Sequence, residues 1–358
     1  MKVLVTGGTG YIGSHTVVEL QQKGFEVVIA DSLVNSYAET VDRIAKITGK
    51  RPIFEHIDLT EKESVNQMFT KHQDIEHIIH FAALKAVGES VQQPLRYYHN
   101  NINSLINILE AMRQYEVKNL VFSSSCTVYG QPDVLPVTET SPIQPALSPY
   151  GHTKQICEEI IAKTVDISTF NAVLLRYFNP IGAHPSALIG EFPLGAPNNL
   201  APCITQFAIG KRPELKVFGN DYNTSDGTAI RDYIHVVDLA QSHVSALERF
   251  INGKNKNRME TYNIGTGNGF SVLEVIRSFE KVSGKKLNYQ IVARRSGDIE
   301  KIWADTTLAN KELQWKAQRG IDEMMLSAWK WEQSLELKIK RGQTLKKSQI
   351  SNRTSHIS

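Results

Sequence analysis

The sequence predicts an α/β protein in which a doubly wound, mainly parallel sheet is followed by a smaller carboxy-terminal lobe. Short apolar runs alternate with amphipathic helical segments over about the first 180 residues, which is typical of such a sheet. The first apolar run ends in a glycine-rich turn. Beyond Phe178 the alternation gives way to loops and short helices, which indicates the second lobe.

Residues 2–6 are aliphatic and β-branched, and they predict a buried strand. The strand leads into Gly7-Gly8-Thr9-Gly10-Tyr11-Ile12-Gly13, and a helix is expected to begin at Tyr11. This order places free backbone N–H groups and the positive end of the helix dipole at one point, where a pyrophosphate can bind. A plain tight turn fits the pattern equally well, so the dinucleotide hypothesis depends on the residues farther along the chain.

Residues 25–30 predict a second strand that ends at Asp31, 18 residues after Gly13. A carboxylate at this tip can accept hydrogen bonds from the adenosine ribose and repels a 2′-phosphate, which favours NAD over NADP. The alternative is a strand-end turn residue. A third strand over residues 52–57 ends at Asp58 and Leu59, where it can reach the adenine edge.

Residues 76–83 predict a fourth strand, and the loop after it carries Lys85. His77 and His80 lie three positions apart on this strand and point to different faces, so they make a poor metal pair, and no metal site is expected. A long amphipathic helix over about residues 95–116 precedes a fifth strand over residues 119–125. The serines of that strand lie at its carboxyl end, where open α/β sheets bind ligands.

The chemical centre is predicted where residues 148–154 open the next helix. Tyr150 and Lys154 lie four positions apart and share one helix face, so the ammonium can lie near the phenol. A free tyrosine has a pKa of about 10, but an adjacent ammonium and an oxidised nicotinamide both lower it, which would make Tyr150 a usable base. An exposed pair on a surface helix is the alternative. The glycine turn and the strand-end Ser125 argue against that alternative.

The glycine turn, Ser125 and the tyrosine–lysine pair resemble those of the extended short-chain dehydrogenase/reductases, which have a Rossmann-type sheet. Within them, the chain closely resembles the UDP-glucose 4-epimerases over roughly residues 1–335. The segments that carry the resemblance are KAVGESV (85–91), SSSCTVYG (123–130), RYFNPIGAHP (176–185) and RDYIHV (231–236).

The resemblance implies an NAD-dependent isomerase of galactose metabolism that interconverts UDP-glucose and UDP-galactose. Tyr150 takes the proton of the sugar 4-hydroxyl while C4 passes hydride to NAD, and Ser125 hydrogen-bonds the same oxygen. The 4-keto sugar then rotates and receives the hydride on its opposite face. Lys154 acts on the cofactor ribose and on the pKa of Tyr150. Arg231 and Arg295 suit a diphosphate, because guanidinium groups match phosphate oxygens.

The family's site residues are carried over position by position. The cofactor contacts implied are Gly7, Gly10, Tyr11, Ile12, Gly13, Asp31, Asn35, Ser36, Asp58, Leu59, Phe81, Ala82, Lys85, Asn100, Ser125, Tyr150, Lys154 and Phe178. The substrate contacts implied are Lys85, Ser125, Tyr150, Asn179, Asn199, Leu200, Phe218, Arg231, Tyr233, Arg295, Asp298 and Ile302. Bulky Ile302 falls where a small residue leaves room for an N-acetyl group, so the hexose substrates are expected to be preferred.

Three alternatives stay open. A nucleotide-sugar 4,6-dehydratase needs an acidic residue just after the strand-end hydroxyl, where this chain has Cys126 and Thr127. An epimerase of UDP-N-acetylhexosamine or UDP-glucuronate shares the mechanism. A non-catalytic dinucleotide sensor shares the fold but has no need of the serine, tyrosine and lysine together.

The expected organisation is an NAD-binding domain over residues 1–178, a nucleotide-sugar lobe over 179–337 and a basic tail over 338–358, with some crossing of the chain between lobes.

The net charge is +3, but six basic residues follow the last acidic one, and without them the rest carries −3. The charge therefore predicts no nucleic-acid partner. With no leader, no membrane span and three unpaired cysteines, a cytoplasmic protein is expected. The resemblance implies a homodimer through helices beginning near Leu95 and Tyr150.

Overall fold

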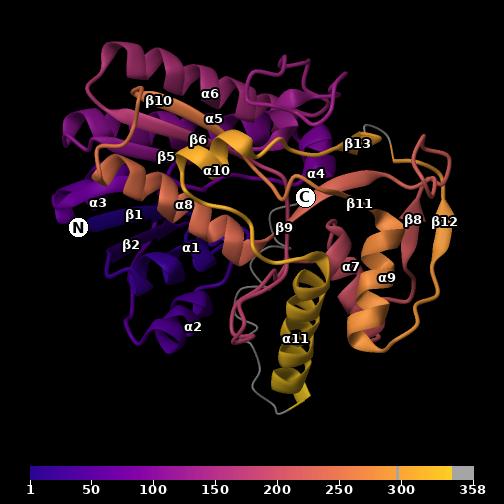
Figure 1. Ribbon diagram of the computed structural model, residues 1–358. Helices are drawn as coiled ribbons and strands as arrows, with labels where there is room; N and C mark the ends of the chain where they lie inside the picture. The colour runs from indigo at the N-terminus through magenta and orange to yellow at the C-terminus, as the bar shows by residue number, and fades with distance from the viewer. Residues whose placement is uncertain (296–297, 341–358) are drawn as a thin grey trace.

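Seven parallel strands form the central sheet, in the order β10-β6-β5-β4-β1-β2-β3 (Figure 1). The structure is a computed structural model, and it describes residues 1–295 and 298–340. The winding direction reverses between β1 and β4, which both pair in parallel with their neighbours, so the predicted doubly wound sheet is confirmed. The strands are β1 (Lys2–Thr6), β2 (Glu26–Asp31), β3 (Ile53–His56), β4 (Ile75–His80), β5 (Asn119–Ser123), β6 (Asn171–Tyr177) and β10 (Met259–Ile264).

Helices cover both faces of this sheet, and each face has its own apolar core. One core joins side chains of α1 (Tyr11–Gln22), α2 (Glu39–Thr48), α8 (Val236–Ile251) and α10 (Thr307–Glu312) to the sheet. The other joins α3 (Lys62–Lys71), α5 (Pro94–Gln114) and α6 (Pro149–Ile167). Figure 1 shows α5 and α6 on one side of the strands and α1 and α2 on the other. The sheet is therefore buried on both faces, as its continuous apolar strands require.

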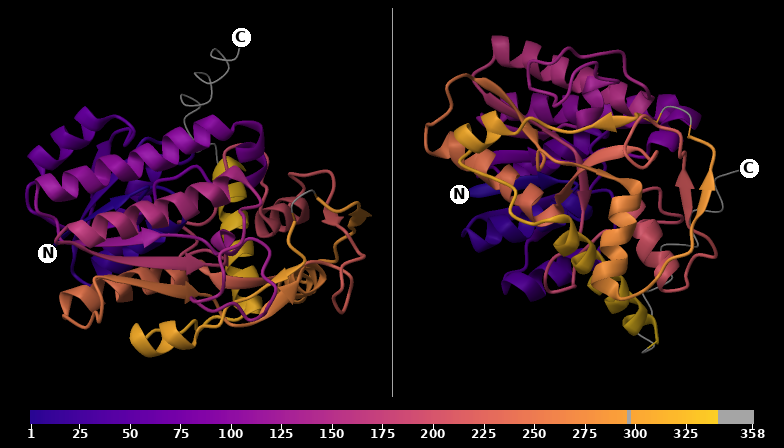
Figure 2. Two further views of the ribbon diagram at one scale, coloured as in Figure 1. Left: turned by 90° about the horizontal axis from the view of Figure 1, so that it is seen from above. Right: turned by 45° about the vertical axis from the view of Figure 1, so that its right-hand side comes forward.

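The second lobe lies beyond the carboxyl edge of the sheet, and both views in Figure 2 show it beside the first. Its helices α7 (Leu200–Ala208), α9 (Val272–Ser283) and α11 (Ile321–Lys340) share a third core. Its strands form one small sheet of β7 (Asn179–Ile181), β9 (Ile230–His235), β11 (Gly269–Ser271) and β13 (Lys301–Ile302), and a pair of β8 (Lys216–Phe218) and β12 (Gln290–Val292). Short α4 (Val87–Gln92) and the 3₁₀ turn η1 (Cys126–Tyr129) complete the described elements.

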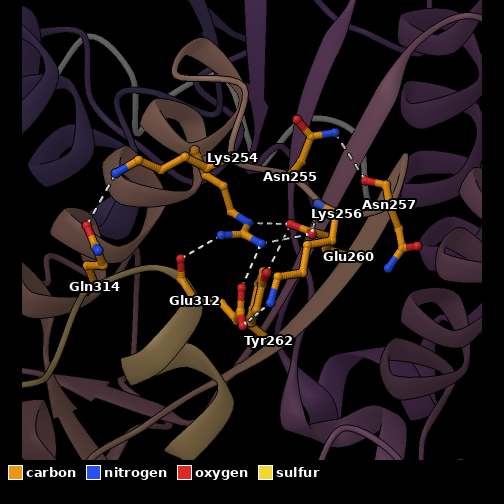
Figure 3. A network of polar contacts seen from close by, with 9 residues as sticks. Lys254, Asn255, Lys256, Asn257, Glu260, Tyr262, Glu312 and Gln314 are labelled. Carbon is orange, nitrogen blue, oxygen red and sulfur yellow. Dashed lines mark hydrogen bonds and ion pairs between the residues drawn. The ribbon is translucent and has the colours of Figure 1, made fainter.

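The chain returns from the second lobe to the first through α8 and β10. Arg249 at the end of α8 bonds Glu260 of β10 through Nε–Oε2 at 2.6 Å and Nη2–Oε1 at 3.1 Å. The same guanidinium donates to Oε2 of Glu312 on α10 at 2.9 Å, and Glu260 also accepts the Tyr262 hydroxyl at 2.9 Å (Figure 3). This buried network fixes β10 at the sheet edge, so residues 236–264 lie with the first lobe although they follow position 178.

The first five strands, the long helix α5 and the starts of α1 and α6 lie within one or two residues of their predicted positions, except at the carboxyl end of β4, while the sequence placed no bounds on α2, α3, α4 or β6. Residues 81–83 and 124–125 follow β4 and β5 in coil. These residues leave the ladder because they turn toward the ligand edge. At the other end of the chain, α11 runs to Lys340, and the remainder of the predicted basic tail, residues 341–358, lies outside the described residues. Among residues 1–295 and 298–340, no helix is long and apolar enough to cross a membrane.

Candidate active site

The glycine turn after β1 is shaped by close backbone packing. Gly7 has φ 68°, and a Cβ there would lie 2.9 Å from the backbone nitrogen of Ala82. A Cβ at Gly13 would overlap the carbonyl oxygen of Gly7, so the third glycine lets α1 pack onto the turn. The Gly10 carbonyl accepts from Ser14 N–H at 2.9 Å, which starts the helix. The turn therefore presents a helix N-terminus of the kind that binds a pyrophosphate.

Asp31 at the tip of β2 is buried beside this turn. Its Oδ2 accepts from Thr9 N–H at 3.1 Å, and its Oδ1 accepts from Leu33 N–H at 2.9 Å and from the Ser36 hydroxyl at 3.0 Å. The structure thus brings Asp31 and Ser36 to the turn, where a ribose would lie, while Asn35 is exposed in the same loop. The residues present fit a dinucleotide with a free 2′-hydroxyl.

The adenine-side residues lie one strand farther along the edge. Asp58 is exposed, and its Oδ1 accepts from the backbone N–H and the hydroxyl of Thr60 at 2.9 and 2.8 Å. Leu59 is buried in the core beneath, and Asn107 of α5 donates to its carbonyl at 2.8 Å. The carboxylate is therefore held by its own turn at the sheet edge.

The loop after β4 lies on the other side of the turn. Ala82 N–H donates to the Thr6 hydroxyl at 3.2 Å, and the Phe81 ring packs against His243 with centroids 4.6 Å apart. The Lys85 ammonium lies 5.9 Å above the Tyr11 ring and 3.6 Å from Oε1 of Glu191 in the second lobe. These contacts bring the two lobes together over the sheet edge.

Asn100 and Asn101 of α5 lie behind that loop. Asn100 Nδ2 donates to Asn101 Oδ1 at 3.0 Å. Asn101 is buried, and it bonds both the N–H and the carbonyl of Leu84, at 2.8 and 3.0 Å, and donates to the Thr153 hydroxyl at 3.0 Å. Asn101 was not among the predicted site residues, and its signal is an amide at a buried position of an amphipathic helix. It ties the loop that carries Lys85 to the catalytic helix.

Helix α6 begins just before Tyr150, because Ser148 caps it there. The Ser148 hydroxyl accepts from Gly151 N–H at 3.1 Å, and Pro149 occupies the first helical position. Tyr150 therefore stands in the first turn, where it is buried and where the Ser125 side chain acts on its phenol. Ser125 itself caps η1 and accepts from Thr127 N–H at 3.3 Å. The structure thus brings the predicted serine and tyrosine together.

Lys154 lies one turn after Tyr150, and only 4% of it is exposed. Its Nζ donates to the Ser123 carbonyl at 2.7 Å and lies 4.7 Å above the Phe122 ring. Burial lowers the pKa of Lys154 to about 8, while the neighbouring Cys157 and Glu158 oppose the shift. Burial raises the pKa of Tyr150 well above 10, and the Ser125 hydrogen bond lowers it. The structure differs from the expectation of a lowered tyrosine pKa because burial outweighs the hydrogen bond.

The predicted nucleotide contacts gather on the second lobe. Arg231 and Tyr233 lie on β9, and Asp298 forms ion pairs with Arg231 at 3.7 Å and with Arg295 at 3.3 Å. The Arg295 guanidinium lies 4.4 Å above the Phe218 ring of β8. The carboxylate thus holds the two guanidinium groups of this cluster near each other. One face of Phe218, which the resemblance assigns to uracil, is covered here by Arg295.

The other predicted substrate contacts lie on β7, at the start of α7 and on β13. Asn179 opens β7 next to Tyr233 of β9, and Asn199 caps α7 before Leu200 while donating to Glu191 Oε1 at 2.5 Å. Ile302 is buried in a cluster with Phe178, and β13 pairs it with Arg231. The cluster also contains Val128, Tyr129, Val137 and Ala304. The structure therefore places Ile302 in the wall that joins η1 to the second lobe.

The three cysteines are free thiols, and burial raises the pKa of Cys126, next to Ser125, to about 12. In the parts of the chain that the structure describes, no group of three or more His, Cys, Asp or Glu residues could hold a metal ion.

Comparisons with known proteins agree with this geometry. Residues 4–327 match the family model described as GDP-mannose 4,6 dehydratase. This match and the likeness of the fold to solved structures show that the chain is an extended short-chain dehydrogenase/reductase, as predicted.

Full-length relatives narrow the class. The chain is 53% identical over 336 residues to the UDP-glucose 4-epimerase of Bacillus subtilis (strain 168), covering 93% of this chain and 97% of that protein. A UDP-glucose 4-epimerase structure from Stenotrophomonas maltophila, with bound NAD and formylated UDP-arabinopyranose, superposes with TM-score 0.90 at 48% identity, over 94% of this chain and 99% of that one. One from Bifidobacterium longum, in complex with NAD+ and UDP, gives TM-score 0.89 at 45% identity, over 93% and 98%. The chain belongs to the UDP-glucose 4-epimerase family, and the predicted enzyme class, an NAD-dependent isomerase, is confirmed.

Proposed function

We propose that this protein interconverts UDP-glucose and UDP-galactose by transient oxidation at C4 with a retained NAD. One observation carries the proposal: Ser125, Tyr150 and Lys154 are all buried at the carboxyl edge of the sheet, with Ser125 just beyond the end of β5 and with Tyr150 and Lys154 one turn apart on α6. A glycine turn of dinucleotide-binding shape lies at the same edge. Relatives and solved structures that contain NAD and UDP-linked groups support the same activity.

The residues of the chain have distinct tasks in this reaction. Bound NAD supplies a hydride acceptor and donor for C4 of the hexose. Tyr150 would take the 4-hydroxyl proton on its phenolic oxygen and, after the sugar has turned, return a proton to the same sugar oxygen, while C4 would receive the hydride on its opposite face. Ser125 hydrogen-bonds that oxygen and keeps it in line. The positive charge of an oxidised nicotinamide favours the phenolate and opposes the effect of burial on the pKa of Tyr150.

The second lobe anchors the nucleotide while the sugar turns. Arg231 and Arg295, held together by Asp298, match the two phosphates of a diphosphate. Binding energy in these contacts keeps the 4-keto sugar from leaving between the two hydride steps. Asn179 and Asn199 offer amides to the sugar and the diphosphate.

Two rival functions have less support. A 4,6-dehydratase requires an acidic catalyst after Ser125, and Cys126 there has its pKa raised to about 12 by burial, so it is a neutral thiol at physiological pH. A dinucleotide sensor leaves the buried serine, tyrosine and lysine without a use. An N-acetylhexosamine or glucuronate epimerase shares the site, and bulky Ile302, buried next to Phe178, favours the plain hexoses.

The function is tested by giving purified protein UDP-galactose without added NAD, quenching, and then measuring UDP-glucose with a coupled dehydrogenase. Turnover supports both 4-epimerisation and a cofactor carried through purification. Failure even with NAD supplied in the first stage directs the search to UDP-glucuronate and the N-acetylated sugars.

We also propose a homodimer in the cytoplasm. Helices α5 and α6 pack side by side, and Tyr98 of α5 donates or accepts a 2.8 Å hydrogen bond with His152 of α6 on their outer side. Leu95, with 81% of it exposed, begins the apolar surface that a second copy would cover. Three free thiols suit a reducing compartment. Sedimentation of the wild type as a dimer and of Leu95→Glu as a monomer is the expected result.

A further inference from the structure

A buried ion pair lies directly behind the catalytic residues. Glu158 is one turn after Lys154 on α6, and Arg176 is on β6. Arg176 Nη2 donates to Glu158 Oε2 at 2.6 Å, and its Nε donates to Oε1 at 3.0 Å. Both side chains are at most 8% exposed. None of the contacts assigned to cofactor or substrate involves either residue, and a buried pair is weak evidence for stability alone.

Each partner also binds one end of the turn that presents Ser125. Before the turn, the buried Ser124 hydroxyl donates to Glu158 Oε1 at 2.5 Å. After it, Arg176 Nη1 donates to the Tyr129 hydroxyl at 3.1 Å, and its guanidinium lies 5.0 Å from the Tyr129 ring centre. Tyr129 is the last residue of η1, so the pair clamps the short segment from Ser124 to Tyr129 at both ends.

The hydrogen bonds around the ion pair continue from Tyr129 to strand β10. The Tyr129 hydroxyl donates to Asn263 Oδ1 at 2.6 Å, and Asn263 lies on β10. Asn263 Nδ2 in turn donates to the Val137 carbonyl at 3.0 Å. A shift of the ion pair would therefore move η1 relative to the tyrosine that begins α6.

We propose that Glu158 and Arg176 are positioning residues for the epimerase reaction: their ion pair fixes the turn that presents Ser125, and it holds the Glu158 carboxylate one helical turn from Lys154. The proposal rests on the proposed function. It concerns residues that touch neither substrate nor cofactor and act through Ser124, Tyr129 and Lys154.

The groups around Lys154 determine whether loss of Glu158 raises or lowers the pKa of Lys154. His80 on β4 is buried with its pKa lowered to about 3 by burial, so it is neutral. Cys157 is a buried thiol with its pKa raised to about 11, mainly by burial. Arg176 is a cation whose pKa burial lowers but Glu158 raises above its ordinary value. The Glu158 carboxylate, one helical turn from Lys154, raises the pKa of Lys154 against the effect of burial.

The first test is Glu158→Gln, with kcat and KM for UDP-galactose measured as a function of pH. We expect kcat to fall about 10- to 100-fold with KM changed less than about 3-fold, because alignment acts on the reaction step. The alkaline limb of the kcat profile should move to lower pH, since the variant loses the Lys154 proton earlier. Glu158→Asp, which keeps the charge, should return the limb toward the wild-type position.

The matched control is Glu260→Gln, which removes a similarly buried carboxylate from Arg249 in the network of Figure 3, on the neighbouring strand β10 and outside the ion pair of Glu158 and Arg176. It should lower the melting temperature as Glu158→Gln does, yet leave the pH profile in place. Equal melting temperatures for the two variants with unshifted pH profiles in both would overturn the positioning role.

A readout without turnover separates this proposal from the function it rests on. The folded pKa of Lys154, about 8, is below its ordinary value of 10.5, so the unfolded chain binds more protons between these values and stability gains with rising pH in that window. The contribution of Lys154 to stability is the difference between each protein and its Lys154→Met variant. In Glu158→Gln this contribution should begin to rise at a lower pH than in the wild type. An unchanged starting pH contradicts the effect on Lys154. Absence of epimerisation by the wild type refutes the function alone.

Discussion

The Lys154 ammonium donates its 2.7 Å hydrogen bond to the backbone carbonyl of Ser123, the last residue of β5. The lysine of the catalytic helix is thereby joined to the strand that leads to Ser125. Burial and this bond fix the ammonium beneath the turn, so α6 and β5 present their functional groups as one unit.

Ser125→Ala should lower kcat for UDP-galactose about 100-fold, as expected for loss of one hydrogen-bond donor to the reacting oxygen. The Ser125 bond lowers the pKa of Tyr150, so its removal raises that pKa. The acid limb of the kcat profile should consequently move to higher pH. A full pH profile of the variant checks both effects. An acid limb at the wild-type position contradicts the assigned bond.

Asp31→Ala should weaken NAD retention about 10- to 100-fold, because it removes a charged acceptor worth ~1.5–3 kcal/mol. The carboxylate also orders Thr9 and Ser36 beside the glycine turn. The rate of NAD loss during dialysis measures the effect. Asp58→Asn, at an exposed position of the same edge, is the control and should change retention much less. Equal NAD loss from both variants contradicts the ribose assignment.

Ile302→Ala should increase turnover of UDP-N-acetylglucosamine relative to UDP-glucose, because it removes three carbons from the buried wall next to Phe178. Kinetics with both sugars measure the ratio. Val137→Ala makes a cavity in the same cluster and serves as the control. A ratio unchanged in Ile302→Ala, or changed equally in both variants, counts against the gate.

Glu260→Gln should lower the free energy of unfolding by about 3 kcal/mol, because it leaves the buried Arg249 without its main partner (Figure 3). Urea unfolding measures the loss. Lys256→Met breaks the ion pair to Glu312 from a lysine that is 65% exposed, and it should cost less than about 1 kcal/mol. A similar loss in both variants contradicts the role of burial in this network.

The sequence predicts the parts of the site that depend on local chemistry. The glycines after residues 2–6 and the Ser148-Pro149 start of α6 specify a turn and a helix end by themselves. Tyr150 and Lys154 follow from helix spacing. For this reason the first half of the fold agrees closely with the prediction.

Features that depend on distant pairing were not predicted. Glu158 resembles a solvent-facing helix residue until β6 brings Arg176 against it. In the same way, the return of β10 to the sheet edge depends on pairing with β6, which no local pattern specifies. The stacking of Arg295 on Phe218 joins a loop to strand β8 of the second lobe, and no local pattern predicts it either.

Oxidation and re-reduction at C4 beside Tyr150 is tested most directly with UDP-galactose that carries deuterium at C4. We expect the UDP-glucose formed in ordinary water to keep the deuterium at C4, as read by mass spectrometry and NMR, because the hydride leaves and returns without meeting solvent. Product with hydrogen from water at C4 would contradict this mechanism, since it would indicate exchange of a proton instead.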